Sequence, residues 1–437
     1  MVTKKKDMPA FIDLFAGCGG MSLGLENAGF MPVYVNELNP DALETYLVNR
    51  RDYYQDLDHF KSNDIKELVG NKRKGLKNLK QKLKKYKIDP DQISLIVGGP
   101  PCQGYSGIGH RRSHSIDKRD VPSNTLYKDM AVVIEFFKPR IFLFENVKGL
   151  LSSRWRKNGA KGEVFKDVLK TFKKIPGYNV RWDVLYAKDY GVPQNRPRVF
   201  IVGFREDIPP SPEAILLDDP GEKPDAVEVK FLPVKENNGH VHLEDLLGDL
   251  VDERYEPGQD KTDTYPANAK EGIQTKIRRR SRKARTSMKK GDKLLEHEYS
   301  NHLERIQKKF AFMIEHGLDN KKLPPKYRTK KFAQRVLPAR WENGSGPWMT
   351  ATSLPDDYVH FKQPRSLTVR EWARIQMFPD WYRFVGKRTT GGIRRAGRPG
   401  ENIHDRELPK YTQIGNAVPV KLAEAIGKHF LKILKKN

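Results

Sequence analysis

Short apolar runs alternate with segments of helical spacing over the first 204 residues of the chain. The runs that read as strands are residues 10–15, 31–37, 93–99, 140–147 and 198–204. The segments between them whose apolar residues recur every three or four positions are 21–29, 40–50, 126–138 and 164–175. Strands separated by helices form a parallel sheet with helices on both faces. The pattern therefore predicts an α/β fold for this part of the chain.

Three further stretches depart from this alternation. Residues 71–87 are rich in lysine, but Leu76, Leu79 and Leu83 form one apolar stripe, which favours a surface helix inserted in the first domain. From residue 205 to about 364 the chain is polar and rich in Pro, Lys and Arg, with few apolar repeats. Residues 418–436 have the spacing of an amphipathic helix, which needs a partner surface.

The chain carries 81 Lys and Arg against 55 Asp and Glu, a formal net charge of +26. This excess indicates a polyanionic partner, with nucleic acid ahead of a membrane surface. Residues 276–293 are especially basic, and we interpret them as a segment that contacts phosphates; a solvated face is the alternative. No apolar run approaches the roughly 18 residues of a membrane helix, and two cysteines make no disulfide framework. We therefore predict a cytoplasmic protein with no membrane contact, associated with the nucleoid if the source is bacterial.

A glycine-rich turn, FAGCGG at residues 15–20, joins the first strand to the first helix, and Glu37 ends the second strand. In such a unit, glycines let a ligand approach the backbone, and the acid can accept hydrogen bonds from two ribose hydroxyls. The turn lacks the GxGxxG spacing, and no phosphate-loop lysine follows it. A nucleoside ligand without pyrophosphate, such as S-adenosylmethionine, therefore fits better; a tight turn with no ligand is the alternative.

Cys102 follows two prolines, in GGPPCQGYS, at the end of another predicted strand. Ligands of open α/β sheets bind at strand ends, and the prolines stiffen the turn, so that the direction of the thiol is set. We interpret Cys102 as a nucleophile. The alternative is a buried thiol that packs as a small apolar group, which the flanking Pro, Gly, Gln and Tyr disfavour.

Two more strands carry polar groups at their ends. Glu145 and Asn146 lie at the end of the run 140–147, where the carboxyl could protonate or hydrogen-bond a ring nitrogen; a helix-capping acid is the alternative. Arg196 and Arg198 stand at alternate positions entering the next strand, so both guanidiniums are expected to point the same way. Such a pair suits a phosphate or a carbonyl group.

Taken in order, these segments resemble the motifs of the DNA (cytosine-5)-methyltransferase family. DLFAGCGGMSLGLENAGF resembles the family's cofactor motif, and GGPPCQGYS resembles its nucleophile motif. ENV resembles the glutamate motif, and QNRPRVFIVG resembles the arginine motif that follows it. The last two motifs match RSLTVREWARIQMFP at 365–379 and YTQIGNAVPVKLAEAIG at 411–427. The resemblance implies an α/β, Rossmann-like domain that depends on S-adenosylmethionine and has a mostly parallel sheet. This catalytic domain would span residues 1–204 and be completed by 405–437, with a smaller target-recognition domain and its hinge inserted at 205–404.

The resemblance also implies an activity, the transfer of a methyl group from S-adenosylmethionine to C5 of cytosine in double-stranded DNA. Cys102 would add to C6 of a base flipped out of the duplex, while Glu145 offsets the charge that develops at N3. The catalytic residues carried over from the motifs are Cys102, Glu145, Arg196 and Arg198. The cofactor-binding residues carried over in the same way are Phe15, Gly17, Gly20, Met21, Glu37, Asp64, Ile65, Asn416 and Val418.

The expected partner is double-stranded DNA, with a cognate restriction endonuclease that acts separately, and the enzyme itself is expected to be a monomer. Residues 104–124 are expected to form a loop that closes over DNA, and no metal site is expected, because His110 and His114 lack a third ligand. Ser123 stands where the family usually has an arginine, with Arg119 upstream. Two alternatives stay open: the tRNA-methylating branch of the family, and a catalytically silent DNA-binding regulator.

Overall fold

The structure is a computed structural model, which describes residues 8–101, 122–208, 223–236, 239–329, 334–342, 344, 346–389 and 407–436. The chain divides into two compact units. Unit 1 comprises Met1–Tyr186, Pro197–Glu236 and Leu422–Asn437, and unit 2 comprises Ala187–Arg196 and Asn237–Lys421. The assignment of a catalytic role to one part and of target recognition to the other stays a prediction.

Unit 1 is built on a seven-stranded sheet with the order β3-β2-β1-β4-β5-β7-β6. The strands are β1 (Ala10–Leu14), β2 (Met31–Asn36), β3 (Lys61–Ser62), β4 (Leu95–Gly98), β5 (Ile141–Val147), β6 (Tyr178–Tyr186) and β7 (Pro197–Arg205). β3, β2, β1, β4 and β5 pair in parallel, whereas β7 runs antiparallel to both β5 and β6. The predicted α/β fold with a mostly parallel sheet is confirmed.

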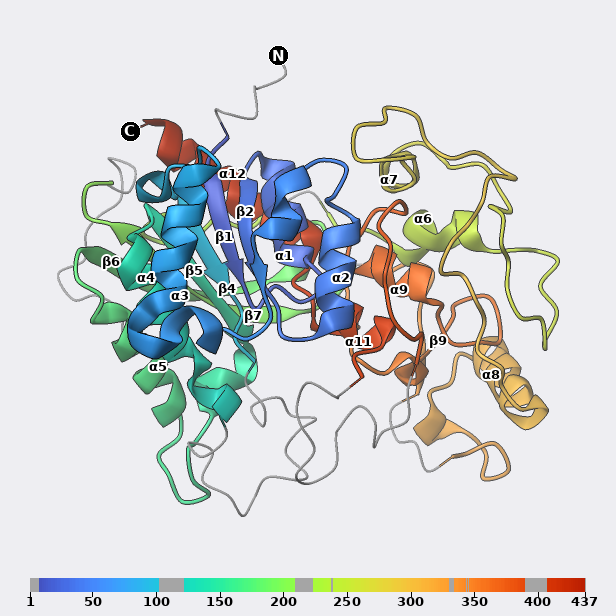
Figure 1. The fold of residues 1–437 in the computed structure, drawn as a ribbon. Helices are drawn as coiled ribbons and strands as arrows, with labels where there is room; N and C mark the ends of the chain where they lie inside the picture. The colour runs from blue at the N-terminus through green and yellow to red at the C-terminus, as the bar shows by residue number, and fades with distance from the viewer. Residues whose placement is uncertain are drawn as a thin grey trace. The chain divides into compact units, whose positions relative to one another are not determined.

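Helices cover both faces of this sheet (Figure 1). They are α1 (Gly20–Ala28), α2 (Pro40–Val48), α3 (Lys66–Lys85), α4 (Leu126–Phe137), α5 (Glu163–Lys173) and α12 (Val420–Lys436). Side chains of α3, α4 and α5 join the larger apolar cluster with one face of the strands, and α2 joins a smaller cluster with Val35 on the other face. Short 3-10 turns complete the unit at Gln55–His59, Pro90–Gln92, Pro122–Thr125 and Lys148–Ser152.

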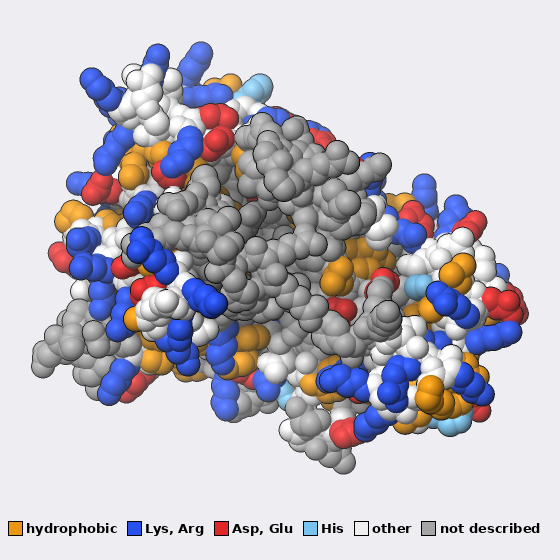
Figure 2. All heavy atoms as spheres, turned by 90° about the horizontal axis from the view of Figure 1, so that it is seen from below, with side chains coloured by type: hydrophobic (Ala, Val, Ile, Leu, Met, Phe, Trp, Pro, Cys, Tyr) orange, Lys and Arg blue, Asp and Glu red, His pale blue; other side chains and the backbone are white. Residues whose placement is uncertain are grey.

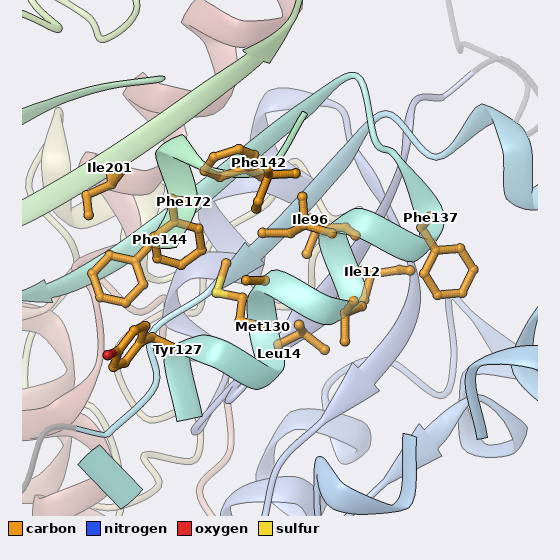
Figure 3. Close-up of a cluster of buried hydrophobic side chains, with 14 of the residues drawn as sticks. Ile12, Leu14, Ile96, Tyr127, Met130, Phe137, Phe142, Phe144, Phe172 and Ile201 are labelled. Carbon is orange, nitrogen blue, oxygen red and sulfur yellow. The ribbon is translucent and has the colours of Figure 1, made fainter. Parts of the chain in front are cut away.

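The larger cluster is the core of unit 1, and Figure 3 shows its centre. Met130 of α4 lies among Leu14, Ile96 and Phe144 from three neighbouring strands (Figure 3). The ring of Phe142 stacks on that of Phe172 of α5, with centroids 5.5 Å apart. Apolar side chains of the strands and of the covering helices therefore pack together on this face of the sheet. This packing holds the strands, and with them the polar groups at their ends, in place.

Two helices predicted as amphipathic find the surfaces they need. In α3, the stripe of Leu76, Leu79 and Leu83 is buried in the core, although residues 70–73 leave helical geometry and kink the helix. In α12, Gly427 approaches α1 so closely that an added Cβ would lie 2.7 Å from the Cβ of Ala28. The C-terminal helix therefore packs on the N-terminal helix within unit 1.

Unit 2 holds shorter elements, whose core depends strongly on charged side chains. They are α6 (Leu243–Leu247), α7 (Ile273–Ile277), α8 (Glu304–His316), β8 (Arg335–Val336), β9 (Tyr358–Val359), α9 (Val369–Ile375) and α11 (Lys410–Asn416), with 3-10 turns at Ala187–Tyr190, Gly248–Leu250, Asn320–Lys322 and Pro355–Asp357. The buried Arg374 binds Asp249 and Asp380, and Asp249 also accepts a hydrogen bond from Arg278 at 2.9 Å. These ion pairs explain how a segment with few apolar repeats forms a compact unit.

Candidate active site

The glycine-rich turn leaves β1 in a conformation that few side chains tolerate. Phe15, Gly17 and Gly19 all have positive φ, at 56°, 55° and 82°. A Cβ added to Gly17 would meet no atom within 4 Å, so the turn borders open space. The positive φ at Phe15 is strain, which proteins retain at binding sites. Gly20 and the buried Met21 then begin α1.

Glu37 follows β2 and binds the turn from the side. Its Oε2 accepts a hydrogen bond from the amide of Gly17, and its Oε1 accepts one from the amide of Asn39, both at 2.8 Å. Burial raises the pKa of the Glu37 carboxyl above its ordinary value, and the hydrogen bonds from the amides of Asn39 and Gly17 only partly oppose this shift. Each carboxylate oxygen accepts more than one hydrogen bond, so Glu37 keeps capacity for two ribose hydroxyls. The turn and Glu37 together fit a nucleoside cofactor.

The next strand end continues this side of the site. Ser62 ends β3 and pairs with Asn36 of β2. Its carbonyl accepts a hydrogen bond from the amide of Glu37 at 3.1 Å, and Asp64 follows two residues later. Asp64 is half-buried, and its Oδ1 accepts from the amide of Lys66 at 2.8 Å. Ile65 is buried in the core. Asp64 therefore follows the strand end that is hydrogen-bonded to Glu37, where an acceptor for the adenine is predicted.

Support for the turn comes partly from residues that sequence reasoning missed. Asp13 of β1 accepts a hydrogen bond from the hydroxyl of Ser22, which lies 2.9 Å from the hydroxyl of Tyr46. Asp13 is 2% exposed, and burial raises its pKa to about 7. The signal was an acid inside an apolar strand, AFIDLF, which has to find polar partners when it is buried.

Glu145 and Arg198 form an ion pair at the ends of β5 and β7. Their Oε1 and Nε atoms are 2.7 Å apart, and their side chains are only 11% and 10% exposed. The register pairs Val147 with Arg198, so Glu145 and Arg198 are diagonal neighbours whose long side chains reach each other. Burial lowers the pKa of Arg198, and Glu145 opposes this shift.

The end of β4 lies against this pair. A Cβ added to Gly99 would lie 2.7 Å from Oε2 of Glu145, so only glycine allows this close approach. The amide nitrogen of the Asn146 side chain donates to the carbonyl of Pro100 at 3.0 Å. The ENV segment therefore binds the backbone at Pro100, two residues before Cys102 in the sequence. Glu145, Arg198 and the carbonyl of Pro100 thus lie at the same edge of the sheet.

The sequence profile of the C-5 cytosine-specific DNA methylase family matches residues 10–432. The chain belongs to this family. It is thus a DNA (cytosine-5)-methyltransferase, as the motifs predicted, and membership implies the use of S-adenosylmethionine and of DNA as the substrate.

Known proteins similar to this methyltransferase carry matching names. Type II methyltransferase M.DdeI of Desulfomicrobium norvegicum is 30% identical over 95% of this chain and 87% of its own length. Type II methyltransferase M.XorII of Xanthomonas oryzae pv. oryzae is 29% identical over 98% of this chain and 86% of its own length. The crystal structure of a DNA modification methyltransferase encoded within an E. coli prophage has a TM-score of 0.64 at 22% identity, covering 98% of this chain and 99% of its own. That likeness shows the fold.

Three further residues expected in the methyltransferase site, Arg196, Asn416 and Val418, belong to unit 2. Arg196 precedes β7, so strand alternation does not extend to it, and its buried guanidinium donates to the carbonyls of Ala351, at 2.6 Å, and Gly415 within unit 2. Asn416, which is exposed, and Val418, which is 6% exposed, also belong to unit 2. The structure thus brings Arg198, but not Arg196, into contact with Glu145.

Several expectations for the methyltransferase lie outside the described residues. They concern the nucleophile Cys102, the loop up to residue 121, Arg119, and the pair His110 and His114. Ser123, which replaces the usual arginine, is described and is buried in the turn Pro122–Thr125. Among the residues that the structure describes, no cluster of His, Cys, Asp and Glu could hold a metal ion, and no helix is long and apolar enough to span a membrane.

Proposed function

We propose that this enzyme methylates C5 of a cytosine within a specific sequence of double-stranded DNA, through a covalent adduct between Cys102 and C6. The observation that carries the proposal is the buried Glu145–Arg198 pair, which lies beside a backbone that ENV anchors at Pro100. An acid and a cation at this strand edge are what a pyrimidine ring needs when a nucleophile adds to it. Cys102, two residues after Pro100 in the chain, supplies that nucleophile.

The chemistry explains the residue types. Cytosine C5 is too weak a nucleophile to accept a methyl group unaided, and addition of the Cys102 thiolate to C6 turns C5 into an enamine-like carbon. The negative charge that reaches the ring is offset at N3, where Glu145 donates or shares a proton. Methyl transfer to C5 would leave S-adenosylhomocysteine. Water then accepts the C5 proton, and the thiolate leaves C6, which restores the ring. Arg198 orients Glu145 and adds positive charge to the site.

Access to C6 requires a displaced base. The thiolate has to approach the ring perpendicular to its plane, and stacked neighbours block that direction in a duplex. The target cytosine therefore leaves the stack and enters the site. Residues 205–404 are the candidates for reading the surrounding sequence, and Cys102 acts on the extruded base.

S-Adenosylmethionine supplies the electrophilic methyl group. Glu37 would bind its ribose, Asp64 its adenine, and the open side of Gly17 would admit the nucleoside next to the backbone. Asn416 and Val418 of the family's last motif stay predicted cofactor-binding residues. The names of the similar proteins support a Type II modification enzyme. That it acts as a monomer, and separately from a cognate endonuclease, is part of the proposal.

Bisulfite sequencing of DNA from cells that express the protein tests this proposal. We expect protected cytosines in one sequence context in cells with the native chain, and none in cells with a Cys102→Ser variant. Sequencing of tRNA from the same cells distinguishes the tRNA-methylating alternative. Unchanged protection in the Cys102→Ser cells would contradict the covalent mechanism, and protection in tRNA alone would contradict the assignment of the substrate.

A further inference from the structure

We propose that Arg50 is a positioning residue for the cofactor, because it holds the C-terminal end of the glycine-rich turn in place. This inference rests on the proposed binding of S-adenosylmethionine at that turn. Arg50 lies two residues after α2, outside every motif identified in the sequence, and is 1% exposed.

The guanidinium of Arg50 joins three parts of unit 1. Its Nε and Nη2 lie 2.8 and 2.6 Å from Oε1 of Glu26 in α1, and its Nη1 donates to the carbonyl of Tyr46 in α2 at 2.8 Å. Nη2 also donates to the carbonyl of Gly19 at 3.2 Å. The guanidinium carbon stacks 3.7 Å from the centre of the Tyr46 ring. Few orientations satisfy all of these contacts, so the group is rigidly placed.

Gly19 is the point at which the turn becomes a helix. It precedes α1 with a left-handed conformation, and its carbonyl accepts the first helical bond, from Leu23, at 2.9 Å. Arg50 fixes this carbonyl, while Glu37 fixes the amide of Gly17 two residues earlier. The turn is thus held at Gly17 by a half-buried carboxylate and at Gly19 by a buried guanidinium. A turn held in its binding conformation spares the ligand the cost of ordering it.

A cap on the last turn of α2 is the simpler role for Arg50, since cations favour helix C-termini. Capping requires only the bond to Tyr46. It does not require the second and third contacts, to Glu26 and Gly19, which tie α2 to α1 and to the turn. These additional contacts distinguish a positioning role from a local one.

A double variant separates cofactor binding from folding. Removal of one partner leaves a buried charge, but replacement of both partners by apolar residues of similar volume is often tolerated. We expect the Glu26→Met, Arg50→Met variant to remain folded and to bind S-adenosylhomocysteine about tenfold more weakly in titration calorimetry, because the turn loses one of its two anchors. We also expect the KM for S-adenosylmethionine to rise by a similar factor, with kcat nearly unchanged.

Arg51 provides the matched control. Arg51 is the next residue in the chain, but its side chain is 42% exposed and pairs with Glu44 and Asp58 on the surface. We expect Arg51→Met to bind S-adenosylhomocysteine as the native protein does. If the double variant does not fold, Arg50→Lys takes its place, because lysine keeps the charge beside Glu26 but lacks the fork that also reaches Gly19.

A folded double variant, or a folded Arg50→Lys variant in its place, with native affinity would overturn the proposal. So would an equal loss of affinity in Arg51→Met. Failure of the native protein to bind S-adenosylhomocysteine would instead contradict the proposed function, which separates the two results.

Discussion

In the proposed mechanism, Glu145 has to stabilise charge at N3 of the target ring, which is the most demanding role assigned to a described residue. Glu145→Gln keeps the size and a hydrogen bond to Arg198, but the amide cannot transfer or share a proton. We expect kcat to fall about 10²- to 10⁴-fold, measured as transfer of labelled methyl groups to DNA at saturating cofactor. The control is Glu135→Gln, on an exposed ion pair with Arg73, which should retain native kcat. A kcat for Glu145→Gln within twofold of native would contradict the assigned role.

Asp13 makes the stability of unit 1 depend on pH. Its pKa is about 7 in the folded protein and near 4 when unfolded, so the folded state binds the proton more tightly. The sign follows from linkage: stability from this group is greatest below pH 4 and is lost as the pH rises to 7, by about 4 kcal/mol at most.

Asp13→Asn removes this titration and retains an acceptor for Ser22. We expect the stability of the native protein relative to the variant to fall between pH 4 and pH 7 in urea unfolding. The comparison of the two proteins cancels other groups, such as the buried His297, whose pKa burial lowers to about 4. Parallel stability curves would show that Asp13 titrates normally.

At the scale of elements, α12 closes the face of the sheet that α1 and α2 share. Phe430 of α12 is fully buried, and its ring contacts that of Phe204 edge-on, with centroids 5.8 Å apart. We expect Phe430→Ala to destabilise the protein by about 3–5 kcal/mol, because the deletion leaves a cavity that the sheet cannot fill.

Urea unfolding measures this loss, and Lys432→Ala, on the exposed side of the same helix, is the control. The control should change stability by less than about 0.5 kcal/mol. Equal effects of the two substitutions would mean that α12 does not pack on the sheet in solution.

At the scale of elements, unit 2 also shows where charged residues of the polar region lie. Arg278 belongs to the basic run 276–293, yet it is fully buried, pairs with Asp249 and stacks 3.9 Å from the centre of the Tyr265 ring. A charged residue of the run thus belongs to the core of unit 2. Arg279, Arg285 and Lys290, by contrast, are exposed and stay candidates for phosphate contact.

At the scale of the whole molecule, the charge of +26 should attract DNA from every side. On the face drawn in Figure 2, Lys and Arg side chains are scattered over the described surface and do not gather in one patch. General attraction and specific phosphate contact therefore have to be separated by experiment. Each phosphate contact contributes about 0.9 to the slope of log affinity against log salt.

We expect a triple variant, Arg279→Gln, Arg285→Gln and Lys290→Gln, to reduce that slope by about 2 to 3, because three phosphate contacts are lost. Fluorescence anisotropy with a labelled duplex at several salt concentrations measures it. The control carries Lys74→Gln, Lys77→Gln and Lys84→Gln on the exposed face of α3, with the same loss of charge. An equal change in both variants would show that the basic run acts only through net charge.

The local pattern of side chains predicted much of the fold of unit 1. Local apolar runs and helical spacings were enough to predict five of its strands, β1, β2, β4, β5 and β7, and the helices between them. These patterns do not depend on contacts with distant residues. β6 was missed, because YNVRWDVLY mixes polar and apolar residues at the edge of the sheet and becomes a strand only through its pairing with β7. The short elements of unit 2 were missed for a related reason, since ion pairs between distant residues build its core.

The sequence by itself determined the family, the order of the motifs and the candidates for the residues that carry the chemistry, because these depend on residue type and local spacing. Only the tertiary structure decided which of them meet. Sheet register places Arg198 against Glu145, whereas Arg196, two residues earlier, binds carbonyls of unit 2. Buried hydrogen bonds identify Asp13, the first residue of the cofactor motif, and Arg50, which lies outside the motifs, as supports of the glycine-rich turn. Contacts between residues far apart in the chain are set by packing and hydrogen bonding of the folded elements, and local spacing carries no record of them.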